Sequence, residues 1–263
     1  MALNSTRRWR ASVVVLGLTL SAAWADEAPK QDAKAVELLK AVDAASKARD
    51  AISAKVVVAE TLGDQKILRA VDVFSAENNT ALILLVTAPK SVAGTGYLRV
   101  ENNLWSYDPG QGRWERRTNR ERLSGTNMRT SDLSAAPLSD SYDPVLDGEE
   151  KTGNVRLRKL VLNAKPGSQV LFPKMVIWVT DEALERKREE YSESGKLLRT
   201  SYVTKTMKVH SPAQNADLNV PAEVKLVDEV EKDRQSVLQF KAFTLGPVPP
   251  NTFTKGWLEG KSR

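Results

Sequence analysis

Apolar and polar positions follow two different rhythms along the chain. Between residues 32 and 50, apolar side chains such as Val36, Leu39 and Val42 recur at three- to four-residue spacing, which predicts one amphipathic helix. After residue 51, short apolar runs separated by turn residues such as Gly63-Asp64 replace this spacing. These runs predict roughly ten or eleven antiparallel strands, with the helix packed against the sheet that they form.

One of the predicted strands lacks the usual alternation. The run Leu82–Val86 is apolar at every position. A one-sided antiparallel sheet carries polar residues on its solvent face, so a strand that is apolar on both faces requires a cover on each side. The run therefore predicts a sheet with a lid or a filled barrel.

The segment LWSYDPGQGRWERR, residues 104–117, predicts a hairpin. A loop at residues 109–112 would place Tyr107 opposite Trp114 and Trp105 opposite Arg116, with ring stacking and a cation–π contact on one face. Such a hairpin forms either a stable exposed surface or the wall of an apolar site. Alternation alone does not decide which face looks inward, because a register slip of one residue inverts the assignment.

The next segment, residues 123–148, is rich in Ser, Asp, Pro and Gly and shows no strand pattern. It contains isolated apolar residues, including Met128 and Leu133, and Ser131-Asp132 could begin a short helical turn. Long irregular insertions in compact domains are commonly functional loops. The pattern predicts a loop or short helices folded over an apolar surface.

The first 25 residues have the features of a secretory signal peptide. Arg7, Arg8 and Arg10 precede the apolar run Val13–Leu20, and Ala23-Trp24-Ala25 supplies a small-residue cleavage site. The apolar run is too short to cross a bilayer, although an uncleaved anchor is the alternative interpretation. We therefore predict cleavage after Ala25, a periplasmic location, and a single domain over residues 26–263.

Charge and reactive side chains narrow the possible functions. The formal net charge is +6 and falls to +3 without the three leader arginines, which argues against nucleic acid as a partner. The sequence contains no Cys and a single histidine, His210, so cysteine–histidine and multi-histidine sites are excluded. Adjacent carboxylates such as Glu189-Glu190 point to opposite faces of a strand. We expect no cofactor, no metal and no catalysis, while a hydrolase built from two distant acids stays open.

Apolar residues exceed what one core face requires, and arginines lie beside them in the sequence. Each buried methylene of a guest molecule contributes about 0.8 kcal/mol, so an acyl chain could supply substantial binding energy. Arginines at the mouth of such a site would suit an anionic head group or a membrane surface, although exposed strand edges also use arginine. The candidate head-group or membrane contacts are Arg113, Arg116, Arg117 and Arg129.

Several of these motifs occur in the order seen in the LolA-like family of outer-membrane lipoprotein-sorting proteins. The chain resembles this family over about residues 50–258. The motifs that carry the resemblance are, in order, Pro89, Gly94-Thr95-Gly96-Tyr97-Leu98, Leu104-Trp105-Ser106-Tyr107-Asp108-Pro109, residues 113–117, Ser124-Gly125-Thr126-Asn127-Met128-Arg129-Thr130-Ser131-Asp132-Leu133, Lys174-Met175-Val176-Ile177-Trp178-Val179, Tyr191-Ser192-Glu193-Ser194-Gly195-Lys196-Leu197 and Asn251-Thr252-Phe253-Thr254.

The resemblance implies a mainly β fold: a curved, incompletely closed antiparallel β-barrel with an N-terminal helix and short lid helices. It also implies an apolar cavity for acyl chains. The residues that we expect to line this cavity are Leu82, Leu84, Val86, Leu98, Trp105, Tyr107, Trp114, Met128, Leu133, Ile177 and Trp178.

The function expected from this resemblance is that of a periplasmic carrier. It would bind lipid or lipoprotein acyl chains and move them between the inner and outer membranes, from an ABC or RND-type exporter to an outer-membrane acceptor. The alternative is a regulatory or sensor module of the same fold that binds a membrane-anchored partner protein. Lipid that copurifies with the protein would favour the carrier, and capture of one membrane-anchored partner independent of lipid would favour the regulator.

Overall fold

A computed structural model describes residues 32–46, 49–118, 121–123 and 126–262. The predicted signal peptide and its cleavage site lie outside these residues. The described chain forms one thirteen-stranded antiparallel sheet. Its strands are β1 (Ile52–Leu62), β2 (Gln65–Ser75), β3 (Ala81–Ala88), β4 (Gly96–Val100), β5 (Asn103–Asp108), β6 (Arg113–Arg116), β7 (Tyr142–Thr152), β8 (Val155–Ala164), β9 (Lys174–Val179), β10 (Glu185–Tyr191), β11 (Leu197–Ser211), β12 (Ala216–Asp228) and β13 (Arg234–Leu245).

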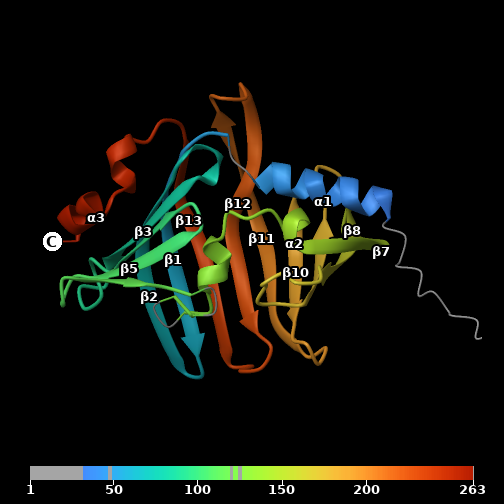
Figure 1. Cartoon of the computed structure of the whole chain (residues 1–263), viewed down its shortest axis with the longest axis horizontal. Helices are drawn as coiled ribbons and strands as arrows, with labels where there is room; N and C mark the ends of the chain where they lie inside the picture. The colour runs from blue at the N-terminus through green and yellow to red at the C-terminus, as the bar shows by residue number, and fades with distance from the viewer. Residues whose placement is uncertain (1–31, 47–48, 119–120, 124–125, 263) are drawn as a thin grey trace, which may run out of the picture. The chain divides into compact units, whose positions relative to one another are not determined.

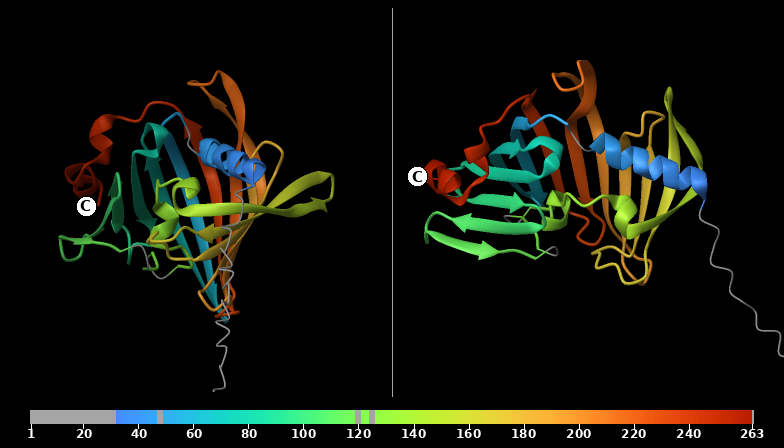
Figure 2. Two further views of the ribbon diagram at one scale, coloured as in Figure 1. Left: turned by 45° about the vertical axis from the view of Figure 1, so that its right-hand side comes forward. Right: turned by 45° about the horizontal axis from the view of Figure 1, so that its top comes forward.

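The strand order shows how the sheet is built. It runs β6-β5-β4-β3-β2-β1-β13-β12-β11-β10-β9-β8-β7, so β13 joins the two halves of the chain by pairing with β1. Within the described sheet, β6 and β7 are the two ends and do not pair with each other, which leaves the curved sheet unclosed (Figures 1 and 2). The predicted fold class, a mainly β and incompletely closed antiparallel barrel, is confirmed.

Three α-helices and three short 3-10 helices accompany the strands in the described residues. The α-helices are α1 (Ala33–Ser46), α2 (Leu138–Ser141) and α3 (Lys255–Lys261), and the 3-10 helices are η1 (Glu77–Asn79), η2 (Thr130–Leu133) and η3 (Pro250–Phe253). Figure 1 shows α1 and α3 at opposite ends of the sheet. Among the described residues, no helix is both long and apolar enough to span a membrane.

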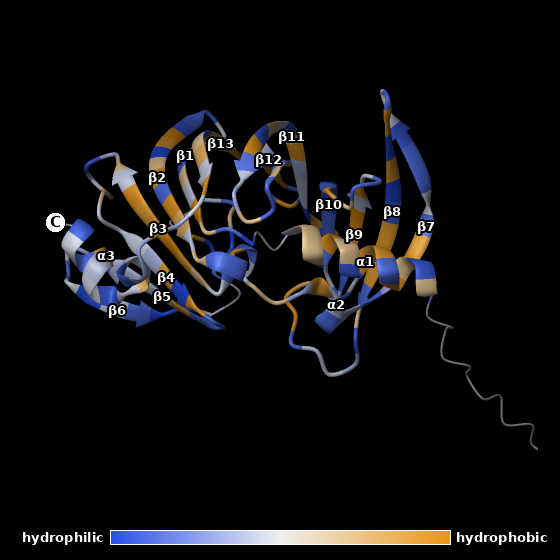
Figure 3. Ribbon diagram, turned by 90° about the horizontal axis from the view of Figure 1, so that it is seen from above, coloured by the Kyte–Doolittle hydropathy of each residue, from blue (hydrophilic) through white to orange (hydrophobic). Residues whose placement is uncertain are grey.

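The sheet has two faces, which we define by what packs on them. The inner face carries α1 and residues 121–123 and 126–133, and the outer face carries α3. Leu84 packs with Leu133 on the inner face, whereas its neighbour Ile83 packs with Leu258 of α3 on the outer face. Successive side chains of a strand alternate in this way, as the hydropathy bands along β2 and β8 illustrate (Figure 3). The apolar run of β3 therefore has a cover on each side, as its composition predicts.

Helix α1 confirms the helix predicted for residues 32–50, although it ends at Ser46. Its buried residues Leu39 and Val42 belong to the cluster that contains Leu160 of β8 and Ile177 of β9. The carboxylate of Asp43 accepts hydrogen bonds from the backbone N–H groups of Leu138 and Ser139, at 2.8 and 2.9 Å. One helix thus closes one end of the inner face and caps α2.

The predicted β5–β6 hairpin forms with the predicted partners. Tyr107 lies opposite Trp114, with ring centroids 5.0 Å apart, and Trp105 lies opposite Arg116. The cation over the Trp105 ring is nevertheless Lys255 of α3, at 5.3 Å, rather than Arg116. The aromatic side of the hairpin is therefore covered by the C-terminal helix.

The prediction that residues 123–148 contain no strand is wrong for residues 142–148, which belong to β7. Helices η2 and α2 supply the expected helical turns, but β7 begins at Tyr142. Strand β7 contains Pro144 and Gly148, and proline and glycine usually interrupt strands. At the end of a sheet a proline needs no N–H partner, and Gly148 takes a φ of +88° beside the irregular register between Leu146 and Glu149.

Candidate functional site

Half-buried apolar side chains form a strip on the inner face, which we call the apolar strip. Val203, Val224, Leu238 and Val58 lie opposite one another across β11, β12, β13 and β1. A parallel row adds Phe240, Val56 and Val71. Val56 and Val58 are buried at the base of the strip. The half-buried members of the strip are Val71, Val73, Val203, Val224, Leu238 and Phe240.

Residues 121–123 and 126–133, which we call the inner loop, pack beside this strip. Leu123 and Leu133 are buried against Leu84 and its neighbours, and Met128 packs against the same cluster. Val71 and Val73 contact this cluster as well as the strip, so the inner loop and the strip adjoin. The loop therefore covers one part of the inner face and leaves the rest half-buried.

A buried arginine ties the inner loop to the sheet. The Arg199 guanidinium of β11 donates to both Asp132 oxygens, at 2.6 and 2.7 Å, and to both Glu190 oxygens, at 2.5 and 2.8 Å. The side chains of Arg199 and Glu190 are each only 3% exposed. Because both carboxylates bind one guanidinium in fork geometry, this contact is strong and directional.

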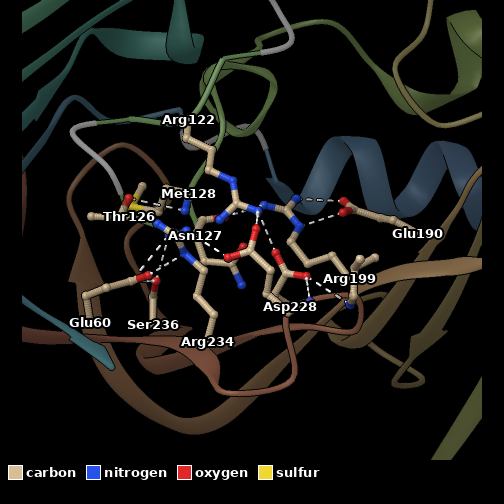
Figure 4. Close-up of polar contacts among 12 residues, drawn as sticks. Glu60, Arg122, Thr126, Asn127, Met128, Glu190, Arg199, Asp228, Arg234 and Ser236 are labelled. Atoms are coloured by element: carbon tan, nitrogen blue, oxygen red, sulfur yellow. Dashed lines mark hydrogen bonds and ion pairs between the residues drawn. The ribbon is translucent and has the colours of Figure 1, made fainter. Parts of the chain in front are cut away.

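A second set of polar contacts holds the other end of the inner loop (Figure 4). Arg122 donates to Asp228 at 2.6 Å. The backbone N–H of Asn127 donates to the Ser236 hydroxyl at 3.0 Å, and this hydroxyl in turn donates to Glu60. The inner loop is thus held by charged and polar contacts on several strands in addition to its apolar side chains.

Five side-chain atoms of the inner loop are buried without a hydrogen-bond partner among the described residues. They are Nη1 of Arg122, Nδ2 and Oδ1 of Asn127, Nε of Arg129 and Oγ of Ser131. A buried polar atom without a partner costs about 1–3 kcal/mol. The inner loop therefore has buried polar groups that no described protein group satisfies.

The structure divides the eleven predicted cavity residues between the two faces. On the inner face lie Leu82, Leu84, Val86, Met128, Leu133 and Ile177, the last of which is covered by α1. On the outer face lie Leu98, Trp105, Tyr107, Trp114 and Trp178. The first four of these pack against or beside α3, and Trp178 lies under the ammonium groups of Lys159 and Lys187. The two groups therefore share no surface.

The four predicted head-group arginines lie in different surroundings. Arg113 is largely exposed beside Glu115, and Arg116 donates to Asn103 at 2.8 Å. Arg117 donates to the Ser106 hydroxyl at 2.7 Å and also pairs with acidic neighbours. Arg129 lies within the inner loop. Of these four, only Arg129 belongs to the segment that covers the inner face.

Two hollows occur near these elements, and neither coincides with the apolar strip. The first, of about 180 Å³, is smaller than the roughly 300–1,000 Å³ typical of ligand pockets. Its lining residues are Val36, Leu39, Lys40, Ser139, Tyr142, Pro144 and Lys165. The second, of about 510 Å³, has a polar lining at the ends of β1 and β13, formed by Thr61, Gly63, Asp64, Lys232, Asp233 and Gln235. Neither hollow therefore combines the size and the apolar lining that an acyl chain requires.

Among the described residues, no three His, Cys, Asp or Glu side chains are arranged to hold a metal. His210 is exposed on β11, with Nδ1 3.3 Å from an Asp217 oxygen, as expected for an isolated surface histidine.

The stability that the pair of Arg199 and Asp132 contributes depends on pH. We call this pair, together with Glu190, the loop anchor. Burial would raise the pKa of Asp132, but the Arg199 guanidinium outweighs this effect and holds the pKa below its ordinary value. The folded state therefore binds the proton of Asp132 less readily than the unfolded chain. Stability from this pair is complete above about pH 4, the usual pKa of aspartate, and is lost as the pH falls through the lowered pKa.

We accordingly expect Asp132→Asn to lower the thermal denaturation midpoint most above pH 4. The difference from the unmodified protein should shrink as the pH falls below the usual pKa of aspartate, because the stability that ionised Asp132 contributes is lost as it becomes protonated. Thermal scans at several pH values measure this difference. A difference that stays constant with pH would contradict the assignment.

Comparisons with known proteins agree with this geometry. A protein-family model with the description "Uncharacterized protein" matches residues 78–260. The solved structure of a LolA superfamily protein from Nitrosomonas europaea is 24% identical and superposes with a TM-score of 0.69, covering 85% of this chain and 98% of that chain. The chain belongs to the family that this model describes, and its fold is LolA-like.

Two further solved structures share this LolA-like fold. An outer membrane lipoprotein-sorting protein domain from Vibrio parahaemolyticus is 17% identical with a TM-score of 0.75, covering 86% of this chain and 98% of that chain. A DUF1329 family protein from Desulfovibrio piger is 16% identical with the same TM-score and the same two coverages. A search of curated proteins gives no match. At these identities the structures show that the fold is LolA-like, and they leave the guest to be argued from the site.

Proposed function

We propose that this LolA-like protein is a periplasmic carrier that holds the acyl chains of a lipid or lipoprotein against its inner face. The observation that carries the proposal is the apolar strip, in which side chains such as Val224, Leu238 and Phe240 are only half-buried on a sheet that does not close. Apolar surface of this kind gains about 25 cal/mol for each Å² that a guest removes from water. A hydrocarbon chain is the simplest guest that makes use of it.

In this proposal the inner loop is a cover that exchanges with the guest. Its apolar residues Leu123, Met128 and Leu133 occupy the inner face beside the strip. Its buried polar atoms without partners lower the free energy required to move it. A guest that displaces the loop would replace the apolar contacts which the loop loses.

The proposed direction of transport follows the LolA-like resemblance. The donor would be an ABC or RND-type exporter of the inner membrane, and the recipient would be an outer-membrane acceptor. A carrier moves a labelled lipid from donor vesicles to acceptor vesicles at a rate that rises with protein concentration. A regulator that only senses lipid would bind the label without accelerating its transfer.

The apolar strip can be tested by placing a charge on it. Leu238→Asp is expected to weaken binding of a fluorescent fatty acid at least about tenfold, because a carboxylate on the strip opposes burial of hydrocarbon. The matched control is Leu68→Asp, at an outer-face residue that is 55% exposed, and it should leave binding unchanged. Fluorescence titration measures the dissociation constants.

A second variant tests the apolar strip without adding a charge, in case Leu238→Asp does not fold. Phe240→Ala removes apolar area from the strip without adding charge, and it should weaken binding by a smaller factor. Thermal denaturation verifies that each variant is folded. The proposal fails if the unmodified protein binds no fatty acid, or if Leu68→Asp weakens binding as much as Leu238→Asp does.

A further inference from the structure

Arg129 is a cation at the base of the inner loop with two other arginines close by. It pairs with Arg122 in an isolated antiparallel bridge, which sets the two residues directly opposite each other. Its guanidinium carbon lies 5.7 Å from the centre of the Phe172 ring, and that of Arg199 lies 5.8 Å from the same ring. Three arginines from two parts of the sequence therefore gather at one place.

The three arginines differ in how their charges are neutralised. Arg122 pairs with Asp228 and Glu231, and Arg199 pairs with Glu190 and Asp132. Among the described residues, no carboxylate lies within ion-pair distance of Arg129. Arg129 is half-buried, and its Nε has no hydrogen-bond partner. It is therefore a partly desolvated cation whose guanidinium forms no direct ion pair with a carboxylate of the described residues.

The electrostatic surroundings of Arg129 favour an anion. Burial, followed by the charges of Arg199 and Arg122, lowers the pKa of Arg129 below the ordinary arginine value. Glu190 and Asp132 offset only part of this effect. An added negative group near Arg129 would interact favourably with all three arginines.

Neighbouring polar atoms supply further donors for such a group. Nη1 of Arg122 and the hydroxyl of Ser131 are buried without partners on the same short segment. Guanidinium N–H groups and a hydroxyl are the usual ligands of carboxylate and phosphate oxygens in proteins. A single anionic group could satisfy several of these atoms together once the loop has moved.

The apolar strip begins next to this cluster. Met128, the residue before Arg129, packs in the cluster that shares Val71 and Val73 with the strip. A molecule with a charged head and hydrocarbon chains could therefore place its head at Arg129 while its chains lie along the strip.

We propose that Arg129, assisted by Arg122 and Ser131, binds the anionic head group of the guest lipid, a carboxylate or a phosphate. This inference rests on the proposed function and specifies its guest as an acidic lipid. The simpler reading, in which Arg129 only stacks on Phe172, predicts a change in stability without any change in head-group preference.

The experiment compares an acidic probe with a neutral one. A fluorescent fatty acid and its methyl ester are titrated into the full chain, into Arg129→Gln and Arg129→Lys, and into the control Arg113→Gln, whose arginine is 66% exposed. We expect the unmodified protein to bind the acid about tenfold more tightly than the ester, equivalent to about 1.4 kcal/mol. Arg129→Gln should abolish this preference without weakening the ester, Arg129→Lys should retain part of it, and Arg113→Gln should retain all of it.

Lysophosphatidic acid and inorganic phosphate distinguish the sources of the anion. The lysophospholipid should compete with the fatty acid in the unmodified protein and lose that ability in Arg129→Gln. Phosphate alone, at millimolar concentration, should not displace the probe, and displacement would overturn the head-group assignment in favour of a free anion.

The possible failures can be told apart. If the unmodified protein binds acid and ester equally, or if Arg129→Gln keeps the full preference, the head-group inference is overturned and the carrier proposal stands. If the unmodified protein binds neither probe, both are overturned.

Discussion

Replacing Arg199 with methionine is expected to lower the free energy of unfolding by about 3–5 kcal/mol. The arginine is 3% exposed and binds Glu190, which is equally buried, as well as Asp132 of the inner loop. Its removal leaves a buried carboxylate without a counter-ion, and the cost of such a charge exceeds the net contribution of the intact pair. Urea denaturation followed by circular dichroism measures the change.

Two further variants test the reason for this loss. The double variant Arg199→Met with Glu190→Leu removes both buried charges, so it should recover part of the stability that Arg199→Met loses. Arg156→Met removes an arginine from an exposed pair with Asp181 and should cost at most about 1 kcal/mol. If the double variant were less stable than Arg199→Met, the unpaired carboxylate could not be the cause.

Leu258→Ala is expected to lower the free energy of unfolding by about 2–5 kcal/mol. Leu258 of α3 has no exposed surface and packs on the outer face with Ile83, Leu85 and Leu98. It also lies directly over Gly96, where a Cβ atom would approach its side chain to 2.5 Å. The fit is so close that truncation leaves a cavity which the strands cannot refill.

The control for this variant is Val100→Ala, at the exposed end of β4, which should change stability by less than about 0.5 kcal/mol. Chemical denaturation measures both. Because α3 lies on the outer face, Leu258→Ala should also leave fatty-acid binding at the inner face unchanged under conditions in which it is folded. Loss of binding in the folded variant would indicate that the guest lies under α3 instead.

Local patterns of the sequence predict much of this fold. The spacing of Leu39 and Val42 predicts α1, and the loop at residues 109–112 predicts the pairing of Tyr107 with Trp114. Both predictions depend on residues that are close in sequence, where geometry leaves few choices. The predicted number of strands, roughly ten or eleven, is too low, since the described sheet has thirteen. Edge strand β7 was not predicted because it contains Pro144.

The site was predicted less well because it depends on contacts between distant segments. Alternation shows that Trp105 and Tyr107 share a face but not that this face is the one covered by α3. Arg199 and Asp132 are separated by 67 residues, and Glu60 and Arg234 by 174, so no local pattern brings them together.

One part of the loop anchor did leave a signal in the sequence. The hairpin that turns at residues 193–195 makes Glu190 and Arg199 cross-strand partners, and opposite charges at such positions indicate an ion pair. Considering Glu189-Glu190 only as a candidate catalytic pair overlooked this ion pair. That the pair is buried follows only from the inner loop above it.

The two unpaired ends of the sheet have a mechanical consequence. In a closed barrel the circumference is set by the number of strands and their stagger, so widening it requires breaking backbone hydrogen bonds. Here β6 and β7 terminate the sheet and do not pair with each other. Small changes in twist between neighbouring strands would therefore widen or narrow the sheet without breaking a ladder, and under the proposed function this would let it hold hydrocarbon chains of different bulk.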